Sequence, residues 1–335
     1  MSAVFLLKRL ILAVPTLFGV TVIVFVLLRV VPGDPINMMI GPGATPQDIQ
    51  TLREIYGLDK SIWDQFVIYL GDLAHGHFGT SISLRQDVLH LILGRLPVTI
   101  ELCLMAMAVA VSAGVGLGVV GAYGRGRWPE AAVDGFAGLV LAIPDFLWAL
   151  LFILLLGVAI PIMPISGRLD FDTEFKPLTE FYLIESLVRG EFRVFLSVLL
   201  HMILPAAALA LPLTAIIARV LKSSINEVMT QDYIMMARAQ GYDRRRIVVR
   251  EALRNALIPT VTLTGVQFTF LVGGTVLIER IFAYPGLGNM AVDAVINRDL
   301  PLIQGIVLTF AVLFLVINLL VDLTYAILNP RLRHG

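Results

Sequence analysis

The chain has 335 residues, of which 58% are apolar and only 15% are charged. Soluble domains average about 45–50% apolar and about 25% charged residues, so this chain has too few polar residues to cover two soluble domains. Its 25 Lys and Arg balance 25 Asp and Glu, and it has one cysteine, which excludes a strongly basic nucleic-acid-binding protein and a disulfide-rich scaffold. We therefore predict an integral membrane protein.

Six stretches are long and apolar enough to cross a bilayer core, which takes about 20 helical residues. The first is preceded by Lys8 and Arg9 like a secretion signal, but it is too long and no small-x-small cleavage motif follows it. The sequence thus predicts an all-α membrane protein with six transmembrane helices. The stretches are residues 10–31, 100–121, 136–160, 195–217, 258–278 and 302–328.

Lysine and arginine are concentrated at both termini and in two of the loops between these helices. All four basic segments fall on one side if the six helices alternate, and the positive-inside rule makes that side cytoplasmic. We therefore expect both termini in the cytoplasm. The expected domains are a first transmembrane helix (1–31), an outer loop (32–97), a core of five transmembrane helices (98–330) with a cytoplasmic loop at 222–257, and a cytoplasmic tail (331–335).

The outer loop is expected to contain two short helices, at residues 51–56 and 61–70, separated by Gly57. Gly71, Gly76 and Gly79 then mark a stretch rich in turns. The loop is therefore expected to be folded rather than a simple linker.

The cytoplasmic loop has the clearest local pattern. Asp232 suits a helix N-cap and Gly241 suits the position after a helix end, so a helix of about two turns is expected between them. Asp243 can cap a second helix, which we expect to end near Leu257 before Pro259 introduces the fifth span. A two-turn helix is marginal in water, so it needs packing, either on this chain or on a docked partner.

The second helix of this loop carries a basic stripe, because arginines recur every four residues at 246, 250 and 254. The pattern alone is equally consistent with an ordinary loop whose arginines meet lipid headgroups. The residues themselves therefore leave a partner-binding and a membrane-surface interpretation open.

The segments Ala237–Gly241 (ARAQG) and Asn255–Pro259 (NALIP) together resemble the "EAA" loop of the permease subunits of ATP-binding-cassette (ABC) importers. Within the peptide-type permeases, Pro164–Arg168 and Pro177–Thr179 resemble the dipeptide permeases most closely. Further segments, which follow one another along the chain in the family's order, match the B-type subunits of peptide permeases. They are Leu28–Pro35, Tyr56–Lys60, Phe78–Ser81, Ala283–Gly288, Leu320–Leu323 and Asn329–Arg331.

The resemblance implies a type I ABC importer permease fold, with a large outer loop after the first helix, in a bacterial inner membrane. It also implies that the short cytoplasmic helix is a coupling helix, which inserts into a groove on a separate ATPase subunit. The residues that it assigns to ATPase coupling are Asp232, Tyr233, Ala237, Arg238, Ala239, Gly241, Arg246 and Pro259.

The partners implied are a second homologous permease, two ABC ATPases, an external solute-binding protein, a peptide substrate and the lipid bilayer, with no nucleic acid. The chain has no Gly-x-x-x-x-Gly-Lys-Ser/Thr motif, so it cannot form a P-loop. We therefore expect ATP and Mg²⁺ to be bound by the partner ATPases, and no catalytic residue, cofactor or metal in this chain.

Ionisable residues inside a membrane indicate function by default. Asp145, beside Pro144, could face the pathway and meet a peptide ammonium, or could satisfy a buried partner. Gln267 and Thr264 of the fifth span are the other pathway candidates, although hydroxyl and small residues also mediate helix packing. Arg29, His201 and Asp322 are expected to be anchoring or structural residues.

The expected function is therefore that of an importer permease subunit, forming half of a pathway for dipeptides or short peptides. A self-sufficient secondary transporter or channel is the alternative, and it would need an ion-coupling carboxylate, for which Asp145 is the one candidate. An intramembrane enzyme is a third hypothesis, which lacks a cluster of catalytic residues.

Overall fold

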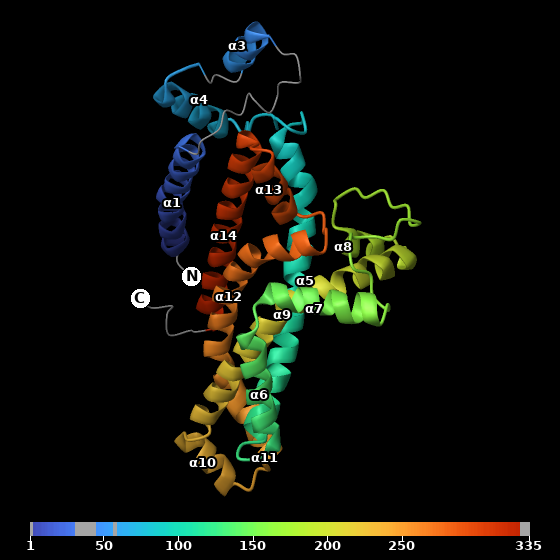
Figure 1. The fold of residues 1–335 in the computed structure, drawn as a ribbon. Coiled ribbons are helices and arrows are strands. Elements are labelled where there is room, and N and C mark those ends of the chain that lie inside the picture. Colours follow the sequence, from blue (N-terminus) through green and yellow to red (C-terminus); the bar gives the residue numbers. More distant parts are fainter. Residues whose placement is uncertain (1–2, 31–44, 56–58, 329–335) are drawn as a thin grey trace. The chain divides into compact units, whose positions relative to one another are not determined.

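The computed structural model describes residues 3–30, 45–55 and 59–328, and these residues form helices and connecting loops with a single isolated β-bridge. Five helical segments are long and apolar enough to cross a membrane, and a bent pair brings the number to six if it counts as one span (Figure 1). The straight ones are Ile11–Arg29, Val88–Tyr123, Phe192–Val228, Arg244–Ile281 and Leu300–Thr324.

The chain forms two compact units. The first contains Val98–Pro285 and the chain from Val316 onwards, and the second contains Ser2–Pro97 and Gly286–Leu315. Helices α5 (Val88–Tyr123) and α14 (Leu300–Leu328) contribute residues to both. Each unit is described by itself below.

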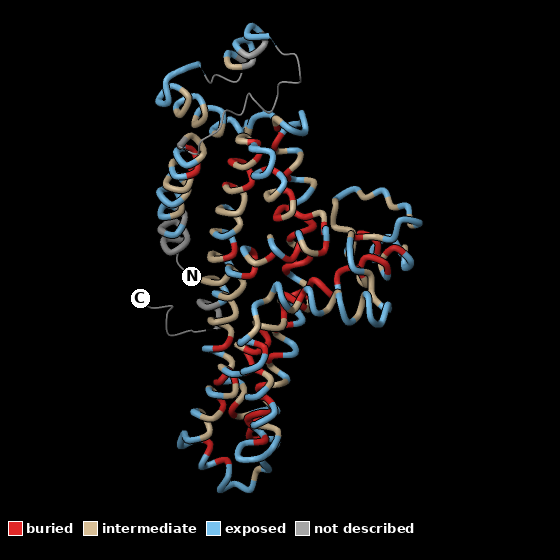
Figure 2. The backbone as a smooth tube through the Cα atoms, viewed as in Figure 1, coloured by how far each residue is buried: buried red, intermediate tan, exposed pale blue. Residues whose placement is uncertain are grey.

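The first unit is built around helix α9 (Phe192–Val228), against which α6 (Trp128–Ala142), α7 (Asp145–Phe152), α8 (Tyr182–Val188) and α12 (Leu253–Ile281) pack. The most apolar stretch of α9 is 61% buried, against 17–28% in the other four straight spans. Figure 2 shows the resulting concentration of buried residues along α9. Apolar side chains left exposed on the other spans fit contact with lipid.

Helix α5 approaches α9 closely through two glycines. A Cβ at Gly114 would lie 2.8 Å from the Ile217 side chain, and one at Gly118 would lie 3.0 Å from Leu221. Small residues spaced four apart allow this approach between membrane helices. Two points of close contact between α5 and α9 therefore depend on glycine.

The third expected span, residues 136–160, is a bent pair rather than one continuous helix. Helix α6 ends at Ala142 and α7 begins at Asp145, with a bend of 98° between them. Pro144 disfavours helical backbone at the residue before it, and Ile143 accordingly has extended dihedrals of −112° and 126°. Helix α7 then continues into a π-helical turn, η1 (Ile153–Ala159).

The second unit contains α1 (Ala3–Val30), α3 (Pro46–Ile55), α4 (Ile62–Ala74) and α13 (Leu287–Ile296), with the first residues of α5, up to Pro97, and of α14, up to Leu315. The two short helices expected in the outer loop correspond to α3 and α4, and Gly57, expected to separate them, lies outside the described residues. Asp299 joins the segments of this unit: its Oδ2 atom accepts hydrogen bonds from the hydroxyls of Ser81 and Ser83 at 2.6 and 2.7 Å.

Candidate functional site: the coupling segment

The short helix α10 (Asp232–Ala239) is held on the first unit by one apolar face. Ile234 is fully buried and Ala237 is 7% exposed. This burial is what allows a helix of two turns to persist, because such a helix is marginal in water. The cluster into which the two side chains pack also contains Ala122, Leu221, Ile225, Ile247, Val248, Ala252 and Ala256.

The opposite face of α10 presents large apolar side chains to the outside. Tyr233 is 41% exposed, Met235 is 53% exposed and Met236 is 65% exposed. Arg238 and Ala239 are exposed as well. Methionine side chains adapt easily to an irregular surface, so this face is suited to packing against another protein.

The helix ends as the sequence predicts, at Gly241. This glycine has a φ of +81°, its N–H donates to the carbonyl of Arg238 at 3.0 Å, and the N–H of Tyr242 donates to the carbonyl of Ala237 at 3.2 Å. This pair of bonds is a Schellman motif, which favours glycine at the left-handed position. At the other end Gln231 occupies the N-cap, so Asp232 is the first helical residue and not the cap that the sequence suggested.

The next helix begins at Asp243, whose Oδ2 atom accepts the N–H of Arg246 at 3.4 Å, as expected for its N-cap. Helix α11 (Arg244–Arg246), the π-helical turn η2 (Ile247–Ala252) and α12 follow without interruption. The expected break before Pro259 is therefore wrong. Pro259 lies inside α12, and membrane helices tolerate proline when neighbouring groups satisfy the freed carbonyl.

We define residues 232–246 as the coupling segment. Two side-chain hydrogen bonds connect it to the long helices. The Nδ2 atom of Asn255, on α12, donates to the Tyr233 hydroxyl at 2.7 Å, and Arg238 donates to the carbonyl of Met229, after the end of α9, at 3.4 Å. The hydrogen bond between Tyr233 and Asn255 could not be predicted from their spacing of 22 residues, although Asn255 belongs to a segment that carries the family resemblance.

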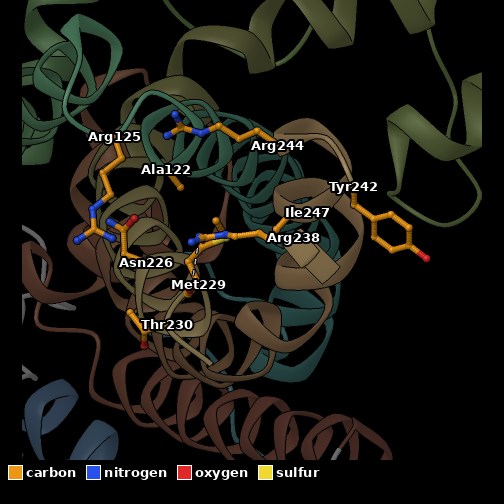
Figure 3. A pocket seen from close by; sticks show the side chains of 9 residues that line it. All are labelled: Ala122, Arg125, Asn226, Met229, Thr230, Arg238, Tyr242, Arg244 and Ile247. Carbon is orange, nitrogen blue, oxygen red and sulfur yellow. Dashed lines mark hydrogen bonds between the residues drawn. The ribbon is translucent and has the colours of Figure 1, made fainter. Parts of the chain in front are cut away.

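A cavity of about 460 Å³ lies beside α10, and three arginines from different elements line it: Arg125, Arg238 and Arg244. Figure 3 shows Arg238 reaching across the cavity, while the ring of Tyr242 points away from the other labelled side chains. The described residues around this cavity include no carboxylate. Three arginines without a lining carboxylate favour the binding of an anionic group. The other lining residues are Ala122, Asn226, Met229, Thr230 and Ile247.

The predicted basic stripe is present but lies elsewhere. Arg246, Arg250 and Arg254 are exposed, and the Arg246 guanidinium lies over the Tyr242 ring, 3.8 Å from its centroid. The stripe does not line the cavity. The sequence did not predict that Arg125, Arg238 and Arg244 line one cavity. Arg125 belongs to the turn between α5 and α6, which is far from the other two arginines in the chain.

Asp145, the first pathway candidate, is the first residue of α7 at the bend. Its Oδ1 atom accepts the N–H of Phe146 at 2.8 Å, and its Oδ2 atom faces α12, where a Cβ at Gly274 would lie 3.6 Å away. Asp145 is half-buried, so its carboxylate is reachable and Gly274 leaves room beside it.

Thr264 and Gln267, the other pathway candidates, lie on α12 and are half-buried. The Thr264 hydroxyl donates to the carbonyl of Thr260 at 2.8 Å, and Thr264 lines a mainly apolar cavity of about 230 Å³ next to Val321 of α14. Gln267 does not line that cavity. Since ten residues of α-helix span about 15 Å, Thr264 and the Gly274 that faces Asp145 belong to different places.

The residues expected to be structural have internal contacts. Arg29 donates from Nε to Oε1 of Gln65 at 2.9 Å, and the Nδ1 atom of the buried His201 lies 2.8 Å from the carbonyl of Ser197. Asp322 is half-buried on α14 and also has an interaction partner. These contacts agree with anchoring roles.

The first unit contains a buried ionic cluster that the sequence did not predict. Arg168, from the loop before α8, pairs with Glu101 of α5 at 2.8 Å and donates to the Glu180 carbonyl at 2.6 Å. Nearby, the Thr99 hydroxyl donates to the fully buried carboxylate of Glu279 at 2.7 Å. We call Thr99, Glu101, Arg168 and Glu279 the anchor cluster, because they join the loop at 161–191 to α5 and α12.

Among the described residues no group of three or more His, Cys, Asp or Glu side chains is placed to hold a metal ion.

Comparison with known proteins identifies the class of protein. The family model of the binding-protein-dependent transport system inner membrane component matches residues 114–334, and the model of the N-terminal part of such membrane components matches residues 2–103. The chain belongs to this family, and it is a membrane subunit of an ABC importer.

Two individual relatives are peptide permeases. The chain is 40% identical, over 331 residues and 98% of both chains, to the di/tripeptide transport system permease protein DppB of Pseudomonas aeruginosa strain UCBPP-PA14. It is also 40% identical, over 334 residues and 98% of both chains, to the dipeptide transport system permease protein DppB of Escherichia coli strain K12. A solved chain of the inward-facing MetNI methionine ABC transporter has a TM-score of 0.54 at 17% identity, covering 72% of this chain and 97% of that one, and shares its fold.

Proposed function

We propose that this chain forms half of the translocation pathway of an ABC importer for dipeptides and other short peptides. A second homologous permease provides the other half, two ABC ATPases bind ATP and Mg²⁺, and an external solute-binding protein delivers the peptide. The chain lies in a bacterial cytoplasmic membrane with both termini and the coupling segment in the cytoplasm. The two peptide permeases that share 40% of its residues support the substrate class.

The observation that carries this proposal is the construction of α10. One face of this short helix is buried in the core of the first unit, while Tyr233, Met235 and Met236 stand exposed on the other. A helix with one face packed into the core and an apolar face exposed can be displaced by a partner, and can pass that displacement on, without unfolding. We assign α10 to the ATPase groove for this reason.

The charges of the coupling segment indicate which side chains the ATPase groove should contain. The cavity lined by Arg125, Arg238 and Arg244 has no carboxylate of its own among the described residues. A groove with an apolar floor for the two methionines and acidic side chains at its edge would match both features. Close charge pairs at such an interface accelerate association and fix its register.

Movement of α10 reaches the membrane through the two helices that carry it. Helix α9 continues for 37 residues to Val228, just before α10, and α12 is tied to α10 by the hydrogen bond from Asn255 to Tyr233. Both helices pack on each other and on α7, which begins at Asp145. A shift of α10 would therefore change the surroundings of Asp145.

Asp145 is the residue we assign to the peptide's amino group. Its half-buried carboxylate lies at the bend, where the span is broken, and broken helices place substrate sites in several transporter folds. Gln267 and Thr264 complete the proposed pathway set. An Asp145→Asn variant should reduce uptake while leaving ATP hydrolysis by the assembled complex close to its ordinary rate.

The experiment is reconstitution of the complete complex in liposomes, with uptake of defined di-, tri- and longer peptides measured together with ATP hydrolysis. We expect uptake that requires ATP and the binding protein, and a strong preference for short peptides. An Ala239→Glu variant should keep assembly and ATP hydrolysis but lose uptake, because it places a bulky charge where α10 meets its partner. Ala239→Ser, which adds no charge at the same exposed position, is the matched control and should keep uptake.

Two results would contradict the proposal. Normal uptake by a normally assembled Ala239→Glu complex would remove α10 from the coupling path. Transport by the purified single chain under an ion gradient, without ATP, would instead favour a self-sufficient secondary transporter.

A further inference from the structure

Helix α4 has an apolar arc that is wider than the surface available to cover it. At 100° per residue, Ile62, Phe66, Tyr69 and Leu73 share one part of this arc, and Trp63, Leu70, Val67 and Ala74 continue it. Within this arc, Phe66, Tyr69, Leu70 and Leu73 are half-buried, and no residue of α4 is fully buried. Trp63 is 71% exposed, Ile62 is 65% exposed and Val67 is 51% exposed, so three large apolar side chains of this arc lie uncovered.

The covered part of the arc packs on the first transmembrane helix. The Phe66 ring lies 4.9 Å from that of Phe25 and 6.4 Å from that of Phe18, and the Tyr69 ring stacks on Phe25 at 5.7 Å. Burial raises the pKa of Tyr69 to about 12, against the opposing effect of the nearby Arg29 charge. Helix α4 is therefore placed by side chains of a helix that itself crosses the membrane.

These contacts set the depth of α4. Arg29 is the last residue of the apolar span, and its guanidinium bonds to Gln65 of α4 at 2.9 Å. Phe25 lies about 6 Å below Arg29 along the helix axis, and Phe18 lies about 16 Å below it, at 1.5 Å per residue. Phe66 contacts both rings, so the inner side of α4 reaches the depth of about 5–10 Å that is typical of helices lying in a membrane interface.

The other side of α4 is mainly polar, with Ile68 as its apolar residue. Asp64, Gly71 and Asp72 lie opposite the apolar arc and are exposed. Tryptophan is the residue that most favours the level of the lipid headgroups, where its ring is half in contact with hydrocarbon and its N–H with polar groups. A helix with this division of faces, tied to the outer end of a span, matches the bilayer surface better than it matches water.

We propose that α4 is an interfacial helix, which lies in the outer membrane–water boundary with Trp63 and Val67 in contact with lipid acyl chains and with Asp64 and Asp72 facing water. This helix thereby fixes the outer loop to the bilayer at the point where the loop leaves the first span. The assignment depends on the membrane nature of the chain and not on its substrate.

The helix has acidic residues and no Lys or Arg between Ile62 and Ala74. Its contact with lipid must therefore come from apolar burial and not from attraction to anionic headgroups. Lipid contact at Trp63 should be the same in zwitterionic and anionic bilayers, and the same at low and high salt. This insensitivity separates α4 from basic membrane-surface helices.

The test uses the full-length chain in phosphatidylcholine nanodiscs. The chain has three tryptophans, so a Trp128→Phe/Trp148→Phe variant leaves Trp63 as the single reporter. Lipids brominated near the headgroup end of the acyl chains should lower its emission about twofold or more, because quenching requires contact at that depth. Aqueous iodide should have little effect.

The matched control moves the reporter to the polar side of the same helix. Ile68 is 43% exposed and lies on the arc of Asp64 and Asp72. A variant with Trp63→Phe and Ile68→Trp, in the same background, should show the reverse: quenching by iodide and little quenching by brominated lipid. Both reporters sit on one helix, so a difference between them reports orientation and not folding.

Three outcomes would overturn the proposal. Strong iodide quenching of Trp63 without bromine quenching would place its face in water. Protection of Trp63 from iodide only after the binding protein is added would assign the face to that partner. Equal bromine quenching of the two reporters would show that α4 has no fixed lipid-facing side.

Discussion

The coupling segment and the anchor cluster hold two loops of the same unit against α5, α9 and α12 by opposite means. At the coupling segment the buried side chains are apolar, and the charges stand exposed: Arg238 and Arg244 have no carboxylate beside them in the described cavity. At the anchor cluster the charges themselves are buried. Arg168 is 5% exposed and Glu101 is 3% exposed, and they neutralise each other at 2.8 Å.

The coupling segment therefore has charges that are exposed and free to bind a partner, whereas the charges of the anchor cluster are already paired within the chain. Exposed cations stay hydrated at little cost, and they remain available to an anionic partner. Buried ions cost several kcal/mol each to desolvate and are tolerated only when they are paired and hydrogen-bonded. We therefore expect the anchor cluster to matter for the stability of this chain and the coupling segment to matter for its partnership.

The first and largest prediction breaks the anchor cluster. Arg168→Met removes the cation and leaves the Glu101 carboxylate buried, with the N–H groups of Leu183 and Ile184 as its remaining donors. The loss should be roughly 3–5 kcal/mol of stability, as for other buried pairs that lose one partner. Thermal unfolding can be followed with a maleimide dye, because Cys103 is the only cysteine of the chain and is buried.

The control for this experiment is the double variant Glu101→Gln/Arg168→Met. Glutamine keeps an oxygen for the two N–H groups but removes the charge, so most of the lost stability should return. A double variant as unstable as the single one would show that packing, and not an unpaired charge, dominates this cluster.

The second prediction concerns the C-terminal ends of α10 and α12, which have the same backbone geometry. Gly241 follows α10 at a φ of +81°, and Ala283 follows α12 at +46° with the same pattern of bonds, from its own N–H to Arg280 and from Tyr284 to Glu279. Gly241→Ala should destabilise the end of α10 by about 1–2 kcal/mol, since left-handed backbone disfavours a Cβ. Faster hydrogen exchange at the last turn of α10 would report this.

Ala283→Gly is the matched variant with the opposite sign. Ala283 is exposed, so glycine there loses no packing and relieves the same backbone strain. Its unfolding midpoint, measured with the Cys103 dye, should not fall. A fall at Ala283, or unchanged exchange in Gly241→Ala, would contradict the common geometry.

The sequence predicts the parts of this molecule that depend on local pattern. Six apolar stretches were recognisable because each is longer than the bilayer core, and the ends of α10 and α11 at Gly241 and Asp243 were recognisable because glycine and aspartate have local backbone reasons to be there. The family resemblance was legible because its segments occur in order along the whole chain.

The parts that the sequence did not predict depend on pairs of residues far apart in the chain. Glu101 and Arg168 are 67 residues apart, and Tyr233 and Asn255 are 22 apart. No local periodicity relates them, because tertiary packing alone brings them together. The bend at Ile143 and the uninterrupted path through Pro259 show a related limit: both prolines follow apolar residues, and packing decides which of them breaks its helix.

The third prediction removes the hydrogen bond between α10 and α12. Tyr233→Phe keeps the ring and loses the hydroxyl that accepts from Asn255 at 2.7 Å. Because this contact is partly exposed, its loss should cost about 0.5–1 kcal/mol, near the lower end for hydrogen bonds. A double-mutant cycle with Asn255→Ala, read from hydrogen exchange in α10, isolates the pair; additive effects would show that the two side chains do not couple.

The fourth and smallest prediction returns to the loop of the anchor cluster. Burial alone would raise the pKa of Glu185, but hydrogen bonds from the Thr179 hydroxyl and from the N–H groups of Leu178 and Thr179, with the Arg189 charge, outweigh it and hold that pKa below its ordinary value. A carboxyl whose pKa is lower in the folded state stabilises the fold above its unfolded pKa of about 4.3, and this contribution is lost as the pH falls through the folded pKa. Glu185→Gln should therefore lower the unfolding midpoint at pH 7 and leave it nearly unchanged at pH 3. If Glu185→Gln lowered the midpoint equally at both pH values, shape and not charge would be what Glu185 contributes.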